Sequence, residues 1–317
     1  MSPGITIPVE NLIPARKRPP FRLALFLLLL TGITTILAGF SLHSAYLYQG
    51  GEISAIPGWA ELISNPMLIL QGVPFALALM LILLSHESGH YFACRYHGIN
   101  CTLPYLIPAP HFLNMFGTFG ALIRIKSPFL NRRQLFDVGI AGPVAGFIVT
   151  LPVLVAGILL SNQTAVSPPE SGYILLFGEP LLFKLVSAVF FEHSPELINL
   201  HPLGWAAWIG MLATSLNLLP AGQLDGGHIL YALFGAKYHK YASAATASGL
   251  LLLGIWSWPV LAYLLFGILL LVMKLRHPPT VFDSYPLDSR RKYLGWAAAV
   301  MFLLTFLPVP IQITGAI

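Results

Sequence analysis

Six long apolar runs dominate this chain and limit what it can fold into. They cover about residues 23–40, 67–85, 134–160, 204–219, 243–273 and 293–308, and several approach the roughly 20 residues that a helix needs to cross a bilayer. With 56% hydrophobic residues, 9% charged residues and a mean hydropathy of +0.76, the chain has too much apolar surface for one water-soluble core. We therefore expect an all-α polytopic membrane protein with about six to seven transmembrane helices.

The charged residues predict how the chain is oriented in its membrane. The net charge of +5 comes from Lys and Arg residues in short clusters beside the apolar runs, a topology signal rather than a nucleic-acid-binding surface. The positive-inside rule then places the amino terminus in the cytoplasm. The basic clusters are Arg16/Lys17/Arg18/Arg22, Arg124/Lys126/Arg132/Arg133, Lys237/Lys240 and Lys274/Arg276/Arg290/Arg291/Lys292. Residues 1–15 do not resemble a transit peptide, and a prokaryotic plasma membrane is the simpler expectation.

The run 243–273 can be read in two ways. Trp256, Ser257, Trp258 and Pro259 interrupt it, so it forms either one tilted helix or two short helices in a hairpin. Basic connections on both sides favour an even number of crossings and hence the hairpin.

The connections between the apolar runs are too short for folded soluble domains. We therefore expect residues 1–317 to form a single membrane domain with a carboxyl-terminal transmembrane region at 236–317. Cys94 and Cys101 have no CxxC spacing and no companion pair, so we interpret them as packing residues rather than a disulfide framework.

The strongest chemical signal lies where the second apolar run ends, in LILLSHESGHYFACRYHG. His86, Glu87 and His90 form an HExxH motif there. Residues four apart in a helix lie on the same face, so the two imidazoles can converge on one cation while Glu87 is free to act as a base. Ionisable groups inside a membrane are costly and mark functional sites.

A catalytic zinc ion takes three protein ligands and leaves one position for water, so a third ligand must come from elsewhere in the chain. The segment NLLPAGQLDGGH breaks an apolar run at Pro220 and presents Asp225, which we interpret as that ligand. His228 is the competing ligand, and a turn Asp that caps a helix is the structural alternative for Asp225. Asn217, on the same segment, is a candidate donor to the scissile carbonyl or a buried tie between helices.

The segment PAPHFLNMFGTFGALIRIK between these motifs has the composition of a bent strand pair rather than a spanning helix. We predict a membrane-inserted β-hairpin-like segment. Its candidate role is to pair with an unwound substrate as an extra strand, which satisfies the substrate's backbone groups. The docking residues would be Gly117, Thr118, Phe119, Gly120 and Ala121.

HESGH followed far downstream by NLLPAGQLDGGH resembles the site-2 protease family of intramembrane zinc metalloproteases, over about residues 67–235. The intervening FGTFGALIRI and LFDVGIAGPVAGF resemble the branch that includes the plant chloroplast members. The resemblance implies one Zn²⁺ per chain, held by His86, His90 and Asp225, with Glu87 activating water. It also implies cleavage of transmembrane segments of membrane proteins within a metalloprotease core at 67–235. The chain resembles a branch without PDZ or CBS domains.

Several alternatives remain open at this stage. A noncatalytic membrane metal-binding protein or a metal carrier would also use a metal site, and a membrane peptidase acting on soluble peptides would share the chemistry. We interpret Asp137 as a packing or helix-start residue rather than a ligand, and His97, His111 and His201 as interfacial. The Gly142/Gly146 spacing permits close helix packing. The sequence identifies neither the substrate, nor the activating signal, nor the oligomeric state.

Overall fold

The computed structural model describes residues 21–110, 114–163, 173–191, 198–257, 262–272, 275, 277–283 and 286–315. His111, the basic residues Arg16, Lys17, Arg18, Lys274 and Arg276, and part of the interruption at 256–259 lie outside this part of the chain.

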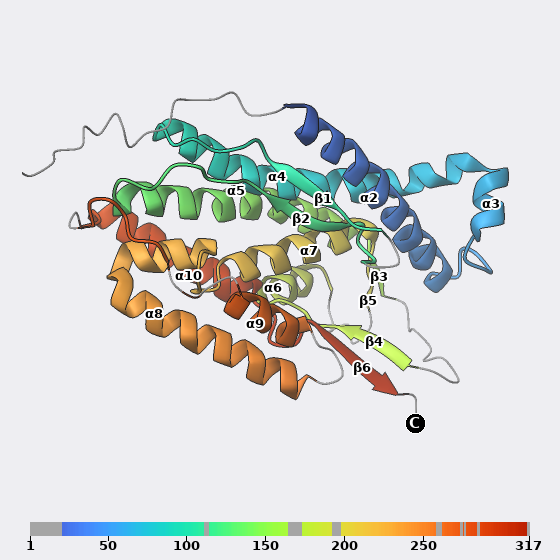
Figure 1. Cartoon of the computed structure of the whole chain (residues 1–317). Coiled ribbons are helices and arrows are strands. Elements are labelled where there is room, and N and C mark those ends of the chain that lie inside the picture. The colour runs from blue at the N-terminus through green and yellow to red at the C-terminus, as the bar shows by residue number, and fades with distance from the viewer. Residues whose placement is uncertain are drawn as a thin grey trace, which may run out of the picture.

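The described part of the chain is mostly helical, as expected, and contains three small antiparallel sheets (Figure 1). The helices are α2 (Phe21–Gln49), α3 (Trp59–Ser64), α4 (Val73–Tyr96, preceded by a 3-10 helix at Pro66–Gly72), α5 (Arg132–Leu159), α6 (Leu181–Phe190), α7 (Pro202–Asn217), α8 (Asp225–Trp256), α9 (Ala262–Val272) and α10 (Ser289–Thr305). The strands pair as β1 (Tyr105–Pro108) with β2 (Thr118–Leu122), β3 (Asn162–Gln163) with β5 (Ile198–Asn199), and β4 (Tyr173–Phe177) with β6 (Ile311–Gly315).

Three helical segments of the described residues are long and apolar enough to cross a membrane: Phe21–Gln49, Pro66–Tyr96 and Arg132–Leu159. The helices α6 and α9 are apolar but shorter. The apolar runs 204–219 and 293–308 also form helices, α7 and α10. The chain is therefore a helical membrane protein, and the count of six to seven crossings stays a prediction, as does the division into 67–235 and 236–317.

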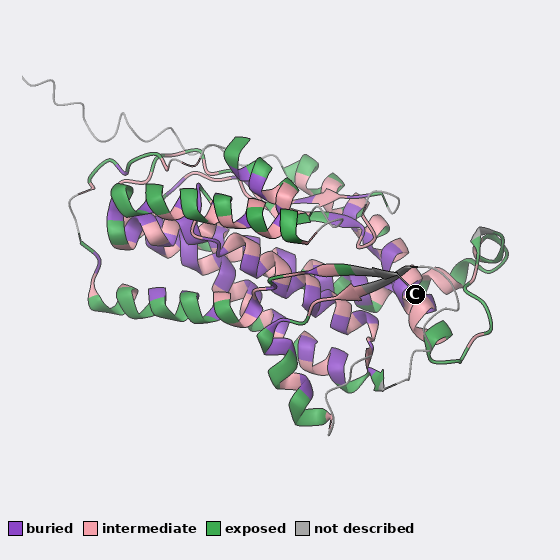
Figure 2. Cartoon of the chain, turned by 90° about the horizontal axis from the view of Figure 1, so that it is seen from below, coloured by how far each residue is buried: buried purple, intermediate pink, exposed green. Residues whose placement is uncertain are grey.

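The core forms where α5 packs against α4, α7 and α8. Figure 2 shows buried positions where the helices face one another and exposed positions on the outer surface. The contact between α4 and α5 is close because small residues meet there. A Cβ atom on Gly89 would stand 2.3 Å from the carbonyl oxygen of Ala141. The same Cβ would stand 3.0 Å from the Cα atom of Gly142, so the close helix packing predicted at Gly142 is confirmed.

The run 243–273 forms two helices, α8 and α9, as the hairpin interpretation expected. They lie against each other so closely that a Cβ atom on Gly254 would stand 2.3 Å from the backbone nitrogen of Leu264. The helix α8 is itself divided at Gly235, where φ is +81°, a conformation that favours glycine. The part of α8 before Gly235 packs in the core, and the part after it continues to the contact with α9.

Ion pairs tie the ends of four segments together. Asp137 on α5 accepts hydrogen bonds from the Nε and Nη2 atoms of Arg291 on α10, at 2.7 and 2.6 Å, and its Oδ2 atom lies 2.9 Å from Nε2 of His97. Arg132 donates two hydrogen bonds to Asp283, at 2.9 and 2.7 Å. Asp137 therefore has a structural role, as the packing interpretation held.

Candidate metal centre

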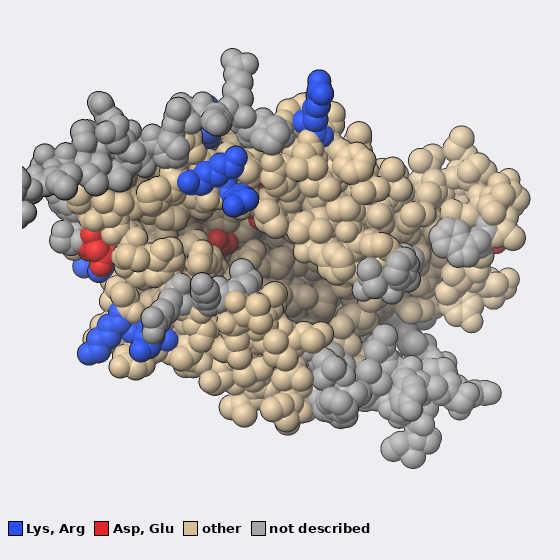
Figure 3. Space-filling model, in the orientation of Figure 1, with Lys and Arg blue, Asp and Glu red and all other residues tan. Residues whose placement is uncertain are grey.

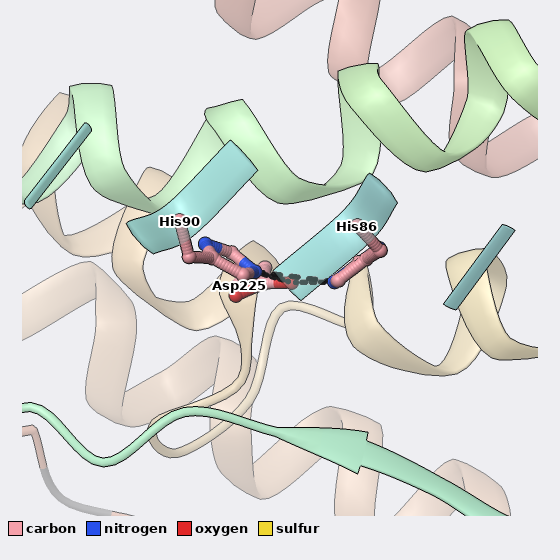
Figure 4. A group of neighbouring side chains, drawn as sticks. All are labelled: His86, His90 and Asp225. Carbon is pink, nitrogen blue, oxygen red and sulfur yellow. Dashed lines mark hydrogen bonds and ion pairs between the residues drawn. The ribbon is translucent and has the colours of Figure 1, made fainter. Parts of the chain in front are cut away.

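Three buried side chains from two helices meet inside the bundle (Figure 4). His86 and His90 lie one turn apart on α4, and Asp225 is the first residue of α8. The Nε2 atoms of the two histidines are 3.1 Å apart, and they lie 3.1 Å and 3.2 Å from the Oδ2 atom of Asp225. The three ligands expected from the sequence are thus brought together, although 139 residues separate His86 from Asp225.

The geometry of this triangle fits a metal ion. Tetrahedral zinc with bonds of about 2.0–2.1 Å places its ligand atoms about 3.3 Å apart, close to the separations of the three atoms here. Two imidazole nitrogens and a carboxylate oxygen are also ordinary zinc ligands. Without a cation, three buried acceptors would point at one another, an arrangement that is costly unless protons are shared. The donor set therefore suits zinc, which the residues His86, His90 and Asp225 would hold.

The ring of His90 is fixed by the neighbouring helix. Its Nδ1 atom lies 2.7 Å from the backbone carbonyl oxygen of Val138, which can only accept a hydrogen bond. Nδ1 therefore carries the proton, and in the neutral ring Nε2 presents a lone pair toward His86 and Asp225.

Two glycines of α5 make room for the histidines. A Cβ atom on Gly142 would stand 2.0 Å from Nε2 of His90, and one on Gly146 would stand 3.1 Å from Cβ of His86. The sequence predicted these glycines as helix-packing residues. In the structure, they also provide the space in which the imidazole rings lie.

Glu87 lines a cavity beside the three ligands. The cavity has a volume of 250 Å³ and is lined by α4, α7, β2 and α9, with His86, Glu87, Gly120, Asn217 and Phe266 among its residues. Figure 3 shows the corresponding face hollowed near its centre, with acidic atoms inside the hollow. Glu87 is 7% exposed and also lies near the backbone amide of Ile123, which follows β2. The Glu87 carboxylate and one of the three ligand residues, His86, thus line the same mostly apolar cavity.

The structure separates the candidates that the sequence left open. The Nδ2 atom of Asn217 lies 3.3 Å from Nε2 of His86, so Asn217 is at the cluster. His228 is not part of the three-residue group, since its Nδ1 atom lies 2.7 Å from Nε2 of His277. His97 lies against Asp137, and His201 accepts a hydrogen bond from the backbone of Leu203 at the start of α7.

A pair of strands borders the cavity, as predicted. β1 pairs with β2 in an antiparallel register that matches Tyr105 with Leu122 and Leu106 with Ala121, with an irregularity before Pro108. Phe119, Gly120 and Ala121 of β2 line the cavity. Among the residues that the structure describes, β2 has β1 as its single strand partner, so its other edge is unpaired.

Sequence reasoning missed two groups near the centre. One is the Val138 carbonyl, a backbone atom that no residue pattern identifies. The other is His277, which reaches His228 from the connection before α10 and whose ring centroid lies 4.6 Å from that of Tyr231, with the two rings tilted by 33°. Burial lowers the pKa of His277 to about 4. A histidine in the broken segment NLLPAGQLDGGH, His228, needs a hydrogen-bond partner when it is buried, but no residue pattern identifies that partner as His277.

The long apolar helices are those of a polytopic membrane protein, and the buried cluster of two histidines and a carboxylate is suited to binding a metal ion. A family model described as Peptidase family M50 matches residues 74–258, and the chain belongs to this family. The resemblance to the site-2 protease family is therefore confirmed.

The chain is also similar to plant proteins. It is 29% identical to the probable zinc metalloprotease EGY2, chloroplastic, of Arabidopsis thaliana, over 97% of this chain and 54% of that protein. It is 31% identical to the probable zinc metalloprotease EGY1, chloroplastic, of Oryza sativa subsp. japonica, over 75% of this chain and 41% of that protein. For EGY1 of Arabidopsis thaliana the identity is 32%, over 75% and 43%. The chain spans about half the length of these curated relatives.

Proposed function

We propose that this protein is an intramembrane zinc endopeptidase that cleaves transmembrane segments of membrane proteins. The observation that carries the proposal is the buried triangle of His86, His90 and Asp225, with His86 and Glu87 both lining the adjacent cavity. Membership of Peptidase family M50 and the similarity to plant proteins named as probable zinc metalloproteases support it. The single ligand triangle among the described residues supports one Zn²⁺ per chain.

The residues of the chain have separate tasks in this proposal. When bound, zinc acidifies its water and polarises the scissile carbonyl. Glu87 takes the proton of the attacking water and returns it to the leaving amine. Asn217 donates a hydrogen bond to the carbonyl oxygen as charge develops there, because its amide lies at the edge of the ligand triangle. Tight glycine contacts between α4 and α5 hold the histidines in place.

The substrate binds in an extended form in this proposal. A transmembrane helix keeps its carbonyls hydrogen-bonded, so it must unwind before attack, and its free backbone groups then need partners in an apolar surrounding. The unpaired edge of β2 borders the cavity and offers such partners, in the manner of an added strand. Pairing of this kind uses the backbone of the substrate and depends little on its side chains.

For the orientation, we propose that the basic end of the bundle faces the cytoplasm, as does the amino terminus, in a prokaryotic plasma membrane. The ion pairs of Arg132 and Arg291 place the start of α5, the start of α10 and the end of α4 at one end of the molecule. Gly235 lies at this end too, since its Cβ would stand 3.0 Å from Arg132, and Lys237 and Lys240 follow it. The positive-inside rule supports the assignment.

The test is a cleavage assay with two matched substrates. The zinc-loaded full chain in lipid vesicles is given a transmembrane segment and a short soluble peptide of the same central sequence. Cleavage of the transmembrane segment alone supports the proposal, whereas preferred cleavage of the soluble peptide indicates a membrane peptidase. If zinc binds stoichiometrically and neither substrate is cut, a noncatalytic metal-binding protein or carrier becomes the better description. Comparing the membrane proteomes of cells that express wild type and Glu87→Gln then identifies natural substrates.

A further inference from the structure

The two cysteines of the chain lie in contact with each other. Cys94 is in the last turn of α4 and is fully buried, and Cys101 packs against its apolar cluster while remaining partly exposed. The chain reverses between them at Gly98, with φ of +70°, and the backbone amide of Ile99 donates to the carbonyl of Cys94 at 2.8 Å. The thiol of Cys94 lies near enough to the sulfur of Cys101 to act on the ionisation of Cys101. Seven residues apart in sequence, the two sulfur atoms are thus neighbours.

The surroundings of the two sulfur atoms differ. Cys94 packs against the apolar side chains of Ile99 and Val138. Cys101 is held by a backbone bridge to Ile125, and the cations of Arg95 and Lys126 act on its sulfur. The neighbouring Cys94 thiol and these two cations lower the pKa of Cys101, while partial burial opposes them. An accessible thiol with a cationic environment and a buried thiol in contact match the arrangement of an attacking and a resolving cysteine.

We propose that Cys94 and Cys101 are a reversible oxidation site, in which peroxide converts the two thiols into an intrachain disulfide and Cys101 reacts first. The inference does not depend on the proteolytic function, because neither cysteine belongs to the metal cluster.

The chemistry balances with hydrogen peroxide as the oxidant. The Cys101 thiolate attacks one peroxide oxygen, the O–O bond breaks, and Cys101 becomes a sulfenic acid while hydroxide leaves and is protonated to water. The sulfur of Cys94 then attacks the sulfur of Cys101, the S–O bond breaks, and a second water leaves with the proton of Cys94. The pair of thiols loses two electrons and peroxide gains them. A dithiol reductant reverses the reaction by thiol–disulfide exchange.

The position of the cross-link gives it a relation to the metal cluster. Cys94 is one helical turn beyond His90, and Val138, which packs against Cys94, provides the carbonyl that accepts from His90. A disulfide here would join the end of the helix that carries HExxH to the segment that leads into β1.

The experiment maps thiols in the purified, zinc-loaded full chain. After exposure to hydrogen peroxide, proteolytic peptide mass mapping should find a Cys94–Cys101 linked peptide, lighter by two hydrogen atoms, in monomeric protein, and dithiothreitol should remove it. In Cys94→Ser, Cys101 should accumulate as a sulfenic acid that dimedone traps. In Cys101→Ser, Cys94 should react at least about tenfold more slowly. Zinc content and helical circular dichroism serve as folding controls for both variants.

Several results would overturn the proposal. They are the absence of the linked peptide at peroxide concentrations that oxidise Cys101 in Cys94→Ser, the formation of cross-links between chains alone, and equal reaction rates of the two single cysteines. If a serine variant does not fold, mapping of the wild-type chain decides by itself, since it requires no substitution.

Discussion

The α carbon of Gly142 faces the imidazole ring of His90, so closely that a methyl group at position 142 would stand 2.0 Å from Nε2. The ring is held from the other direction by its 2.7 Å hydrogen bond to the Val138 carbonyl. Both contacts come from α5, which itself contributes no ligand. The helix next to HExxH therefore sets where the second histidine points.

Gly142→Ala should weaken zinc binding, because the added methyl group displaces the ring of His90 from the ligand triangle. We expect a loss of about 10–100-fold in zinc affinity, measured by competition with a chelator. Gly249→Ala on α8 is the matched control, since a Cβ there meets nothing within 4 Å. Alanine suits a helix interior better than glycine, so this variant should bind zinc normally and unfold no earlier. Equal zinc affinity of the two variants would contradict the role of Gly142.

Glu87→Gln should keep zinc and lose proteolysis, because the amide preserves size but cannot accept a proton from water. The expected decrease in rate is about 10²–10⁴-fold. His86→Ala should lose both zinc and activity, since it removes a ligand. Metal analysis of the purified variants and the transmembrane-segment assay give the two readouts. Cleavage by Glu87→Gln at a rate near wild type would show that another group is the general base.

Lys237→Cys and Glu52→Cys test the orientation, in a background with Cys94 and Cys101 replaced by serine. Lys237 lies two residues after Gly235, at the basic end of the bundle. Glu52 lies three residues after the carboxyl end of α2. A membrane-impermeant maleimide added to whole cells should label position 52 and should reach position 237 only after permeabilisation. The reverse pattern would invert the proposed topology.

Lowering the pH from 6.5 to 4 should destabilise the protein, in part through His277. Burial lowers its pKa from 6.5 to about 4, so in this window the unfolded state binds a proton that the folded state does not. Stability from the neutral ring is present above pH 6.5 and is lost as the pH falls through the window. His277→Gln retains an acceptor for His228 but does not titrate. The free energy of unfolding should fall by about 2 kcal/mol less in this variant between pH 7 and 4.5.

Proline at Thr118 or Ala121 should reduce cleavage of a transmembrane substrate by about tenfold, because it removes a backbone donor from the strand that borders the cavity. Leu122→Ile keeps the backbone unchanged and is the control. All variants are compared at equal zinc content, which separates lost docking from misfolding. If both proline variants cleave as the wild type does, the substrate is held by side chains elsewhere.

The metal ligands and the helical class could be predicted from sequence because each rests on a local pattern. The i, i+4 spacing of His86 and His90 fixes their common face in any helix, and Gly-rich LDGGH marks a break in an apolar run. The strand character of residues around Gly117 and Gly120 was equally local, and β2 forms there.

The remaining features depend on contacts between distant segments. The pairing of Asp137 with Arg291 joins residues 154 apart, and no spacing rule specifies such a partner. The Val138 carbonyl is invisible to residue types, since every residue carries one. The break in α8 at Gly235, where φ is +81°, lies where a Cβ atom would stand 3.0 Å from Arg132, a residue 103 positions earlier in the chain. Apolar length also failed to fix the number of crossings, because short apolar helices occur inside helical bundles as well.

The separation of the ligands in sequence has a consequence for biosynthesis. His86 and His90 emerge from the ribosome well before Asp225, which follows His86 by 139 residues. The ion pairs between Arg132 and Asp283 and between Asp137 and Arg291 join residues that are even farther apart in sequence, so they form later still. While its first helices are being inserted, the nascent chain therefore has only part of the ligand set, and under the proposed function it could not yet cut neighbouring nascent membrane proteins. Under the proposed function, the complete ligand set forms only late in synthesis, so the order of the motifs delays the onset of activity.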